Sequence, residues 1–176
     1  MAAEQPWYVG ERAEALAIVY LTRREDLDVV SASACMRSSG YDLLVYVGGR
    51  DEPEPVTFAV EVKGQLSHRA RSSRSGDITF SVPHTPRELQ TSGIPVCLFL
   101  FTVDDRQGFN RWLFRPVITP EGKAELVFDE DSSVRVNETR PGQILVRSRF
   151  RKLTNEAIDV IVDEVTKWHK ASHHRS

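Results

Sequence analysis

Apolar residues follow a helical rhythm near both ends of this chain and a strand-like alternation through most of its middle. Residues 10–24 repeat apolar side chains every three or four positions, which predicts an amphipathic helix. Residues 153–170 show the same spacing and predict a second helix, for which Thr154 is a suitable N-cap. The two ends of the chain are therefore expected to be helical and its centre to form a sheet.

Short runs rich in β-branched and aromatic residues predict the strands of that sheet. They are residues 27–31, 43–47, 56–62, 77–82, 96–103, 111–117, 124–128, 133–136 and 144–147. The run 96–103 is apolar at nearly every position, which predicts a strand buried on both faces in the centre of a mixed sheet. A short helix is predicted over 86–91, and loops over 31–40 and 66–76.

The length of the chain, 176 residues, fits one domain. We therefore expect a single α/β domain over 1–176, with a central mixed sheet flanked by helices. Its core would cover about 8–118, followed by a C-terminal extension of strands and the helix over 153–170.

Residues 41–65 carry three charged side chains where half-buried strands normally have none. Two strand-like runs flank a connector rich in Gly, Pro, Asp and Glu, which predicts a β-hairpin. Asp42 opens the first strand, and Glu61 and Lys63 close the second on one face, because side chains alternate along a strand. A hairpin would bring two carboxylates and an ammonium group together.

Asp42 followed by Glu61-x-Lys63 on the next strand resembles the PD-(D/E)xK nuclease superfamily, which has the restriction-endonuclease-like fold. Tyr41 stands where the superfamily name has Pro, a position that the superfamily keeps loosely. Gln65 lies two residues past the lysine, as in several subfamilies. The resemblance covers roughly the first two-thirds of the chain, and it is strongest to small bacterial domains of uncharacterised function.

The resemblance extends upstream to residues 13–21, which look like the first helix of small superfamily members. Several members supply an additional metal-facing glutamate from this helix. Glu14 lies at the edge of the apolar helix face and Glu11 on the opposite side, so Glu14 is the candidate. A solvated charge at this position is an equally good interpretation.

The resemblance implies a Mg²⁺-dependent nuclease in which Mn²⁺ can substitute, because hard cations prefer oxygen ligands. The implied metal ligands are Asp42, Glu61, Glu14 and the backbone carbonyl of Val62. Lys63 would orient the attacking water and stabilise charge on the phosphate, and Gln65 would hold the water or a phosphate oxygen. The alternative for the charged residues is an exposed sheet edge with a Glu–Lys ion pair that adds little stability.

The net charge of −2 is unusual for a protein that binds nucleic acid, but the distribution of charge matters more than the sum. Arg69, Arg71 and Arg74 follow Lys63 in a serine-rich loop and are candidate phosphate contacts. DNA is the expected partner, and RNA stays open. Many proteins of this fold cut two strands as dimers, so a homodimer is compatible with this interpretation.

The sequence contains no separate DNA-reading module, so we expect weak sequence specificity or targeting by a partner protein. One alternative function is a catalytically weak or inactive nuclease-fold module that binds DNA or a partner protein. Another is a metal-independent interaction domain, in which the C-terminal helix or a strand edge mediates dimerisation.

The chain has no apolar run long enough to span a membrane and no signal-peptide pattern, which predicts a cytoplasmic protein without a membrane partner. Cys35 and Cys97 are too far apart in sequence for a typical zinc motif, and a buried Cys97 is expected. His169, His173 and His174 fall at the end of the second helix, where a solvated tail is favoured over a metal site.

Overall fold

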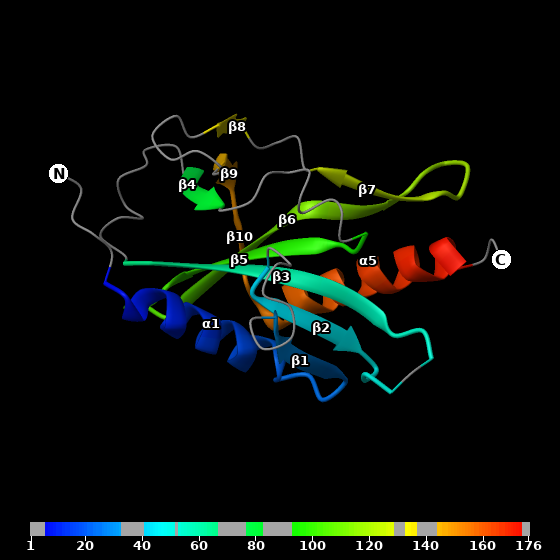
Figure 1. The fold of residues 1–176 in the computed structure, drawn as a ribbon, viewed down its shortest axis with the longest axis horizontal. Helices are drawn as coiled ribbons and strands as arrows, with labels where there is room; N and C mark the ends of the chain where they lie inside the picture. Colours follow the sequence, from blue (N-terminus) through cyan, green and yellow to red (C-terminus); the bar gives the residue numbers. More distant parts are fainter. Residues whose placement is uncertain are drawn as a thin grey trace.

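The structure is a computed structural model, and it describes residues 6–32, 41–51, 53–66, 77–82, 93–128, 133–136 and 144–173. Over 77–82, 133–136 and 144–149 it describes the backbone alone. Within these residues the protein is α/β, with one helix near each end of the chain and a mixed sheet between them (Figure 1).

The helices are α1 (Tyr8–Leu21) and α5 (Asn155–His173). The strands are β1 (Leu27–Ser31), β2 (Leu43–Val47), β3 (Val56–Gln65), β4 (Asp77–Val82), β5 (Val96–Thr102), β6 (Gln107–Ile118), β7 (Ala124–Phe128), β8 (Ser133–Val136), β9 (Ile144–Arg149) and β10 (Arg151–Lys152). Each predicted strand is confirmed, and β3, β6 and β9 are longer than predicted. The predicted helix over 86–91 lies outside the described residues, as do the predicted loops over 31–40 and 66–76 apart from residues 31, 32 and 66. Ser31 belongs to β1.

Seven of the described strands form the main sheet, in the order β1-β2-β3-β5-β6-β10, with β7 also paired to β6. Strands β3 and β5 are parallel, and the other pairs in this sheet are antiparallel. The remaining strands form a separate three-stranded sheet in the order β4-β9-β8, which the sequence did not predict.

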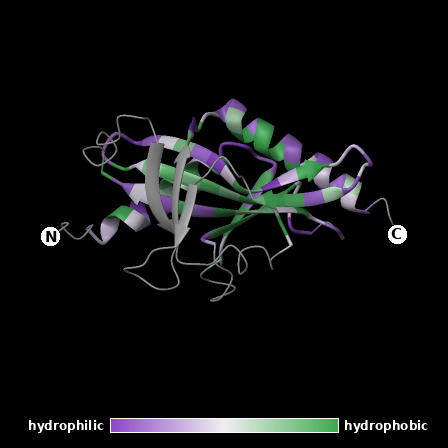
Figure 2. Ribbon diagram, turned by 90° about the horizontal axis from the view of Figure 1, so that it is seen from above, coloured by the Kyte–Doolittle hydropathy of each residue, from purple (hydrophilic) through white to green (hydrophobic). Residues whose placement is uncertain are grey.

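Both helices pack on the same face of the main sheet. One cluster of buried residues joins α1, α5 and the central strands, and it includes Phe58, Phe99 and Phe101. In Figure 2 the hydrophobic residues run along the central strands and alternate with polar ones along the helices. The C-terminal helix therefore belongs to the same core as the N-terminal one.

A glycine lets α1 lie directly against the end of β3. A Cβ atom on Gly64 would lie 2.5 Å from the backbone oxygen of Val9 and 2.9 Å from Cβ of Ala13. Both contacts are closer than van der Waals contact allows, so only glycine fits this crossing. The crossing holds α1 beside the end of the strand that carries Glu61 and Lys63.

The C-terminal helix is capped as predicted, because the backbone N–H of Ala157 donates to Oγ1 of Thr154 at 3.2 Å. Replacing Thr154 with Ala is expected to lower the free energy of unfolding by about 1 kcal/mol. Thr154→Ser should retain most of this stability. Urea unfolding of both variants tests the effect, and equal losses from Ala and Ser would contradict a role for the hydroxyl group.

Two tryptophans tie α5 to the sheet. Nε1 of Trp112 donates to Oε2 of Glu164 at 2.7 Å, and Nε1 of Trp168 donates to the backbone oxygen of Glu125 at 2.9 Å. Phe114 is buried and Trp112 is partly buried against the core, so the aromatic residues of β6 pack in the interior. Neither described helix is long and apolar enough to cross a membrane.

Candidate active site

The site lies on the face of the main sheet opposite α1 and α5. Phe58, Val60 and Val62 of β3 point into the core under the helices, so alternation places Glu61 and Lys63 on the other face. Glu61 is only 2 % exposed, although it is a charged residue. A glutamate is rarely buried to this degree unless it is paired.

Asp42 lies beside Glu61, as the predicted hairpin requires. Strand β2 pairs with β3 from Leu43, which faces Val60, and Asp42 directly precedes this pair. The carboxylate of Asp42 lies close enough to that of Glu61 to raise its pKa. The backbone N–H of Asp42 donates to the oxygen of Val60 at 3.1 Å. Its side-chain Oδ2 accepts the N–H of Val62 at 2.7 Å, which fixes the carboxylate at the start of β2.

Glu61 and Lys63 form an ion pair on this face, between Oε1 and Nζ. The side chain of Lys63 is 25 % exposed and that of Glu61 is 3 % exposed, so the lysine reaches solvent and the glutamate does not. Burial raises the pKa of Glu61 to about 7, against the attraction of Lys63, and the neighbouring Asp42 carboxylate raises it further. The Glu61 carboxyl group therefore changes charge near neutral pH.

The carbonyl group of Val62 points toward the Asp42 side of β3. The N–H and C=O groups of one strand residue lie on the same side of the strand, and the N–H of Val62 bonds Asp42. The first paired residue of β2 is Leu43, so the carbonyl of Val62 lies beyond the last rung of that ladder. It therefore lies on the same side of β3 as the Asp42 carboxylate.

Gln65 ends the row of polar side chains on this face. Its backbone oxygen accepts the N–H of Val103 at 3.0 Å. Its Nε2 is buried, and among the described residues it has no hydrogen-bond partner. A buried amide without a partner costs free energy, so this group is available to an added acceptor such as a water or a phosphate oxygen.

Glu14 is not gathered with the other two carboxylates. Its Oε1 accepts a hydrogen bond from Oγ of Ser31 at 3.2 Å, at the end of β1. Within the described part of the chain, no group of three or more His, Cys, Asp or Glu side chains is placed to hold a metal ion. The candidate set therefore consists of Asp42 and Glu61 with Lys63, and the candidates Arg69, Arg71 and Arg74 lie outside the described residues.

Arg111 is a buried cation on the same face that the sequence analysis did not single out. Leu98 of β5 is paired with Glu61 on one side and with Arg111 of β6 on the other, so all three share one face of the sheet. Arg111 is 7 % exposed. Its position within an apolar strand was the signal that would have identified it.

Cys97 is buried and its pKa is raised by burial, so it is an inert core residue as predicted. Cys35 lies outside the described residues.

Comparison of the whole chain with protein-family models, curated proteins and solved structures gave no match.

Proposed function

We propose that this protein is a metal-dependent nuclease that hydrolyses phosphodiester bonds, with DNA as its substrate. The observation that carries the proposal is the buried pair of carboxylates, Asp42 and Glu61, beside the partly exposed Lys63. A stable fold does not need a glutamate buried in this position, because its pKa near 7 makes the charged form unfavourable. Buried carboxylates with shifted pKa values are typical of sites that bind cations or move protons.

The arrangement of the chain supports the finer assignment to a restriction-endonuclease-like core. Helix α1 packs on a sheet in which the β2–β3 hairpin is followed by the parallel strand β5. Asp42 opens one strand of the hairpin, and Glu61 and Lys63 lie near the end of the other. This is the order of elements and charges on which the resemblance to the PD-(D/E)xK superfamily rests.

The donor atoms on this face fit a hard divalent cation. Asp42 and Glu61 supply carboxylate oxygens, and Val62 supplies a carbonyl oxygen directed to the same side. Mg²⁺ is held by one or two carboxylates together with water and phosphate oxygens, so three protein oxygens are sufficient. When bound, the ion would lower the pKa of a coordinated water and neutralise charge on the phosphate.

Each side chain then has a separate task. Asp42 and Glu61 would hold the cation, and Asp42 keeps its orientation through the N–H of Val62. Lys63 reaches solvent, so its ammonium group can orient a water and stabilise the charge that develops on the phosphate oxygens. The unpartnered amide of Gln65 donates to that water or to a phosphate oxygen.

The proposal is tested by cleavage of supercoiled plasmid DNA with Mg²⁺ or Mn²⁺. We expect metal-dependent nicking that Asp42→Ala abolishes and that Lys63→Ala lowers by about 10²- to 10³-fold, the usual effect of removing one charge-stabilising group. Lys123→Ala is a matched control, because Lys123 is exposed in the turn before β7. Its activity should equal that of the unmodified protein.

Linear duplex, single-stranded DNA and RNA extend the assay to the other substrate classes. Failure of the unmodified protein to cut any of these substrates with either ion would overturn the proposal. Cleavage that persists in both Asp42→Ala and Lys63→Ala would place the activity elsewhere in the preparation or in the chain.

One observation favours a second candidate, a nuclease-fold module that binds nucleic acid or a partner protein without cutting. Glu14 is engaged with Ser31 and does not add a third carboxylate to Asp42 and Glu61. Such a module would bind DNA or a protein partner in the absence of divalent ions, and the metal-dependent nicking described above distinguishes the two functions.

A further inference from the structure

Cations are concentrated in the segment that leads from β9 to α5. Residues 139–155 contain five Lys or Arg residues and no Asp or Glu, although the whole chain is net negative. Four of the five lie within residues 147–152, and we call these four the basic edge: Arg147, Arg149, Arg151 and Lys152. Figure 1 shows β9 and β10, which carry them, one after the other on the way to α5.

The three-stranded sheet has one basic face. Side chains alternate along a strand, so Arg147 and Arg149 lie on the same face of β9. Arg135 of β8 belongs to this face too, because it is paired with Leu145, two residues before Arg147. Asp77, paired with Arg149, is the one acidic residue at the described register positions of this face. The register therefore gathers three cations and one anion on one face of the sheet.

The opposite face of the same sheet is apolar at most of its positions. Strands β4 and β9 pair so that Phe80 is opposite Val146 and Val82 is opposite Ile144. An antiparallel sheet with this pattern commonly packs its apolar face on the core and keeps its polar face in water. The pattern therefore favours the basic face as the one that meets a partner.

The other two cations of the basic edge are exposed, and the backbone that carries them is held in place. Arg151 and Lys152 form β10, which pairs with β6 at the edge of the main sheet. Nδ2 of the buried Asn110 donates to the backbone oxygens of Arg151 and Lys152, at 3.3 and 3.2 Å. None of the ion pairs between described residues involves either cation. Both charges are therefore fixed in position and available to an added anion.

Lys152 lies on the face of the main sheet that carries the proposed nuclease site. One register row crosses four strands through Lys63, Leu100, Phe109 and Lys152. Neighbouring strands are about 4.8 Å apart, so the two lysines are separated by roughly 14 Å across the sheet. This separation is comparable with the width of the major groove of DNA, about 12 Å, so one duplex can contact both lysines.

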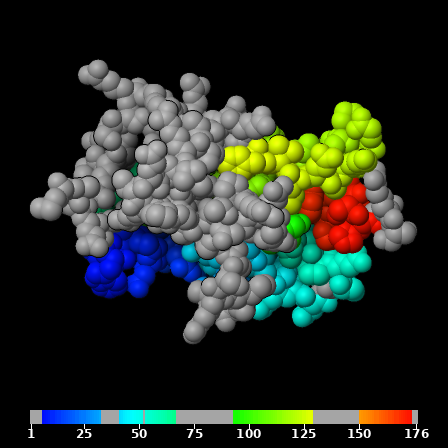
Figure 3. All heavy atoms as spheres, turned by 45° about the horizontal axis from the view of Figure 1, so that its top comes forward, coloured from blue at the N-terminus to red at the C-terminus, as the bar shows by residue number. Residues whose placement is uncertain are grey.

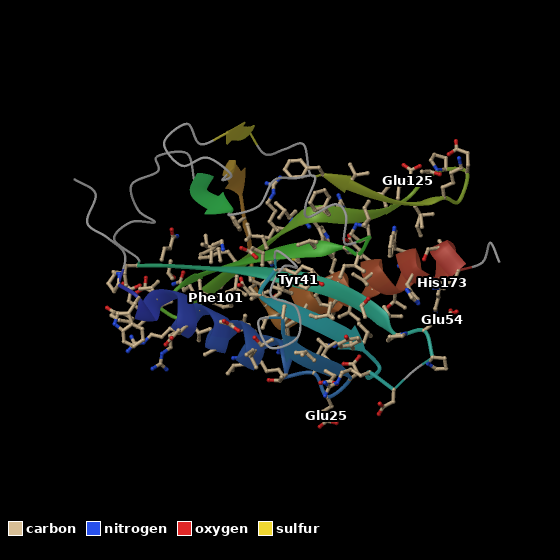
Figure 4. All side chains as sticks on the ribbon, viewed as in Figure 1. Glu25, Tyr41, Glu54, Phe101, Glu125 and His173 are labelled. Atoms are coloured by element: carbon tan, nitrogen blue, oxygen red, sulfur yellow. The ribbon has the colours of Figure 1, made fainter. Side chains whose placement is uncertain are left out.

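Carboxylates gather at another part of the molecule. The connection between β2 and β3, in cyan, meets the end of α5, in red, in Figure 3. There Oε2 of Glu54 lies 3.7 Å from Nε2 of His173, because α5 continues three residues further than predicted. His169 and His173 thus belong to the helix and not to a solvated tail, while His174 lies outside the described residues. Figure 4 shows Glu54 and Glu125 toward this end of α5, away from β9 and β10.

We propose that the basic edge binds the phosphate backbone of duplex DNA beside the proposed nuclease site. The proposal deepens the proposed function, on which it rests for DNA as the partner. Three of the four cations are arginines, whose planar guanidinium groups can bind phosphate oxygens with two hydrogen bonds. Alternate residues of a strand are about 6.7 Å apart, so Arg147 and Arg149 begin a regular row that suits a polymer of phosphates better than one small anion. Contacts to phosphates position the duplex without reading its sequence.

Fluorescence anisotropy with a labelled DNA duplex tests the surface, with EDTA present so that nothing is cut. When the logarithm of affinity is plotted against the logarithm of salt concentration, each phosphate contact adds about 0.9 to the negative slope. Replacing all four cations of the basic edge with Gln should therefore lower the slope by about 3 to 4. Affinity in about 0.1 M salt should fall at least about tenfold.

A control variant removes the same charge elsewhere on the surface. In it, Gln replaces four exposed cations: Arg12, Lys123, Lys167 and Lys170. Its slope should stay within about 1 of that of the unmodified protein. Circular dichroism checks folding, and if the variant of the basic edge does not fold, Arg151→Gln and Lys152→Gln should each lower the slope by about 1 as single changes. An unchanged slope in the basic-edge variants, or an equal fall in the control, would overturn the proposal.

Binding and cleavage are measured separately, so the two proposals can fail separately. If DNA is never cut but its binding depends on the basic edge, the nuclease proposal fails and the DNA-binding surface stands. If DNA is cut and its binding does not depend on these cations, the surface proposal fails and the nuclease stands. Poly-glutamate or phosphatidylserine vesicles that displace the duplex at equal total charge would also overturn the choice of DNA as the partner.

Discussion

Replacing Glu61 with Gln is expected to abolish metal-dependent cleavage and, in the same protein, to raise stability at alkaline pH. Cleavage is lost because the amide of Gln cannot replace a carboxylate as a ligand for a hard cation. Stability rises because Glu61 is buried and its charged form is unfavourable. Most core substitutions lower activity and stability together. A substitution that abolishes cleavage while it raises stability would therefore be diagnostic of a functional residue.

The size of the effect on stability follows from the pKa of Glu61, which is about 7 in the folded protein against an ordinary value of 4.5. For a group with a raised folded pKa, the contribution to stability is complete below pH 4.5 and is lost as the pH rises through 7. Each pKa unit corresponds to about 1.4 kcal/mol, so the loss approaches about 3 kcal/mol by pH 8. Gln does not titrate, so the Glu61→Gln protein does not undergo this loss of stability.

Urea unfolding of the metal-free protein at pH 4.5 and pH 8 measures this difference. The variant should equal the unmodified protein at pH 4.5 and exceed it by about 1–3 kcal/mol at pH 8. Glu25→Gln is the control, because Glu25 is exposed in the loop between α1 and β1 and should change neither property. A Glu61→Gln protein that is less stable at pH 8 would mean that the ion pair with Lys63 stabilises the fold, and retained cleavage would exclude Glu61 from the site.

Replacing Gly64 with Ala is expected to destabilise the protein by about 2–3 kcal/mol, the upper range for overpacking a close contact. The new methyl group would lie 2.5 Å from the backbone oxygen of Val9 and 2.9 Å from Cβ of Ala13. A backbone atom cannot rotate away as a side chain can, so α1 must shift from β3. Chemical denaturation measures the loss, and cleavage activity should also fall because Lys63 is the adjacent residue.

Gly10, which lies in α1 itself, provides the control. A Cβ atom there would have no neighbour within 4 Å, so Gly10→Ala should raise stability by about 1 kcal/mol through helix propensity alone. The two glycines are expected to respond with opposite signs to the same substitution. Equal stability of Gly64→Ala and the unmodified protein would show that α1 adjusts at no cost.

Local patterns were sufficient to predict the two terminal helices, most of the strands, and the proximity of Asp42 to Glu61. The alternation in 43–47 and 56–62 defines which residues face the core, and a hairpin needs only a turn between such runs. The register of β2 and β3 follows, and Asp42 therefore lies beside Glu61 in the structure as expected. The cap at Thr154 is equally local and was also predicted.

The tertiary structure decided the features that depend on residues far apart in the sequence. The burial of Glu61 depends on the parallel pairing of β3 with β5 and on what covers that face, and no local pattern encodes it. For Glu14 the sequence left a site-facing and a solvated position equally open, and the side chain bonds Ser31, because its position depends on how α1 crosses the sheet.

The contact of Glu54 with His173 could not be predicted from the sequence either, because the two residues are far apart along the chain and only the tertiary fold brings the hairpin to the end of α5. Sequence by itself determined the secondary structure, the hairpin and its charged residues, because alternation and turns act over a few neighbouring positions. Burial, the raised pKa of Glu61 and the pairing of distant charges were decided by packing, because they depend on which faces of the sheet are covered and on what the helices bring beside it.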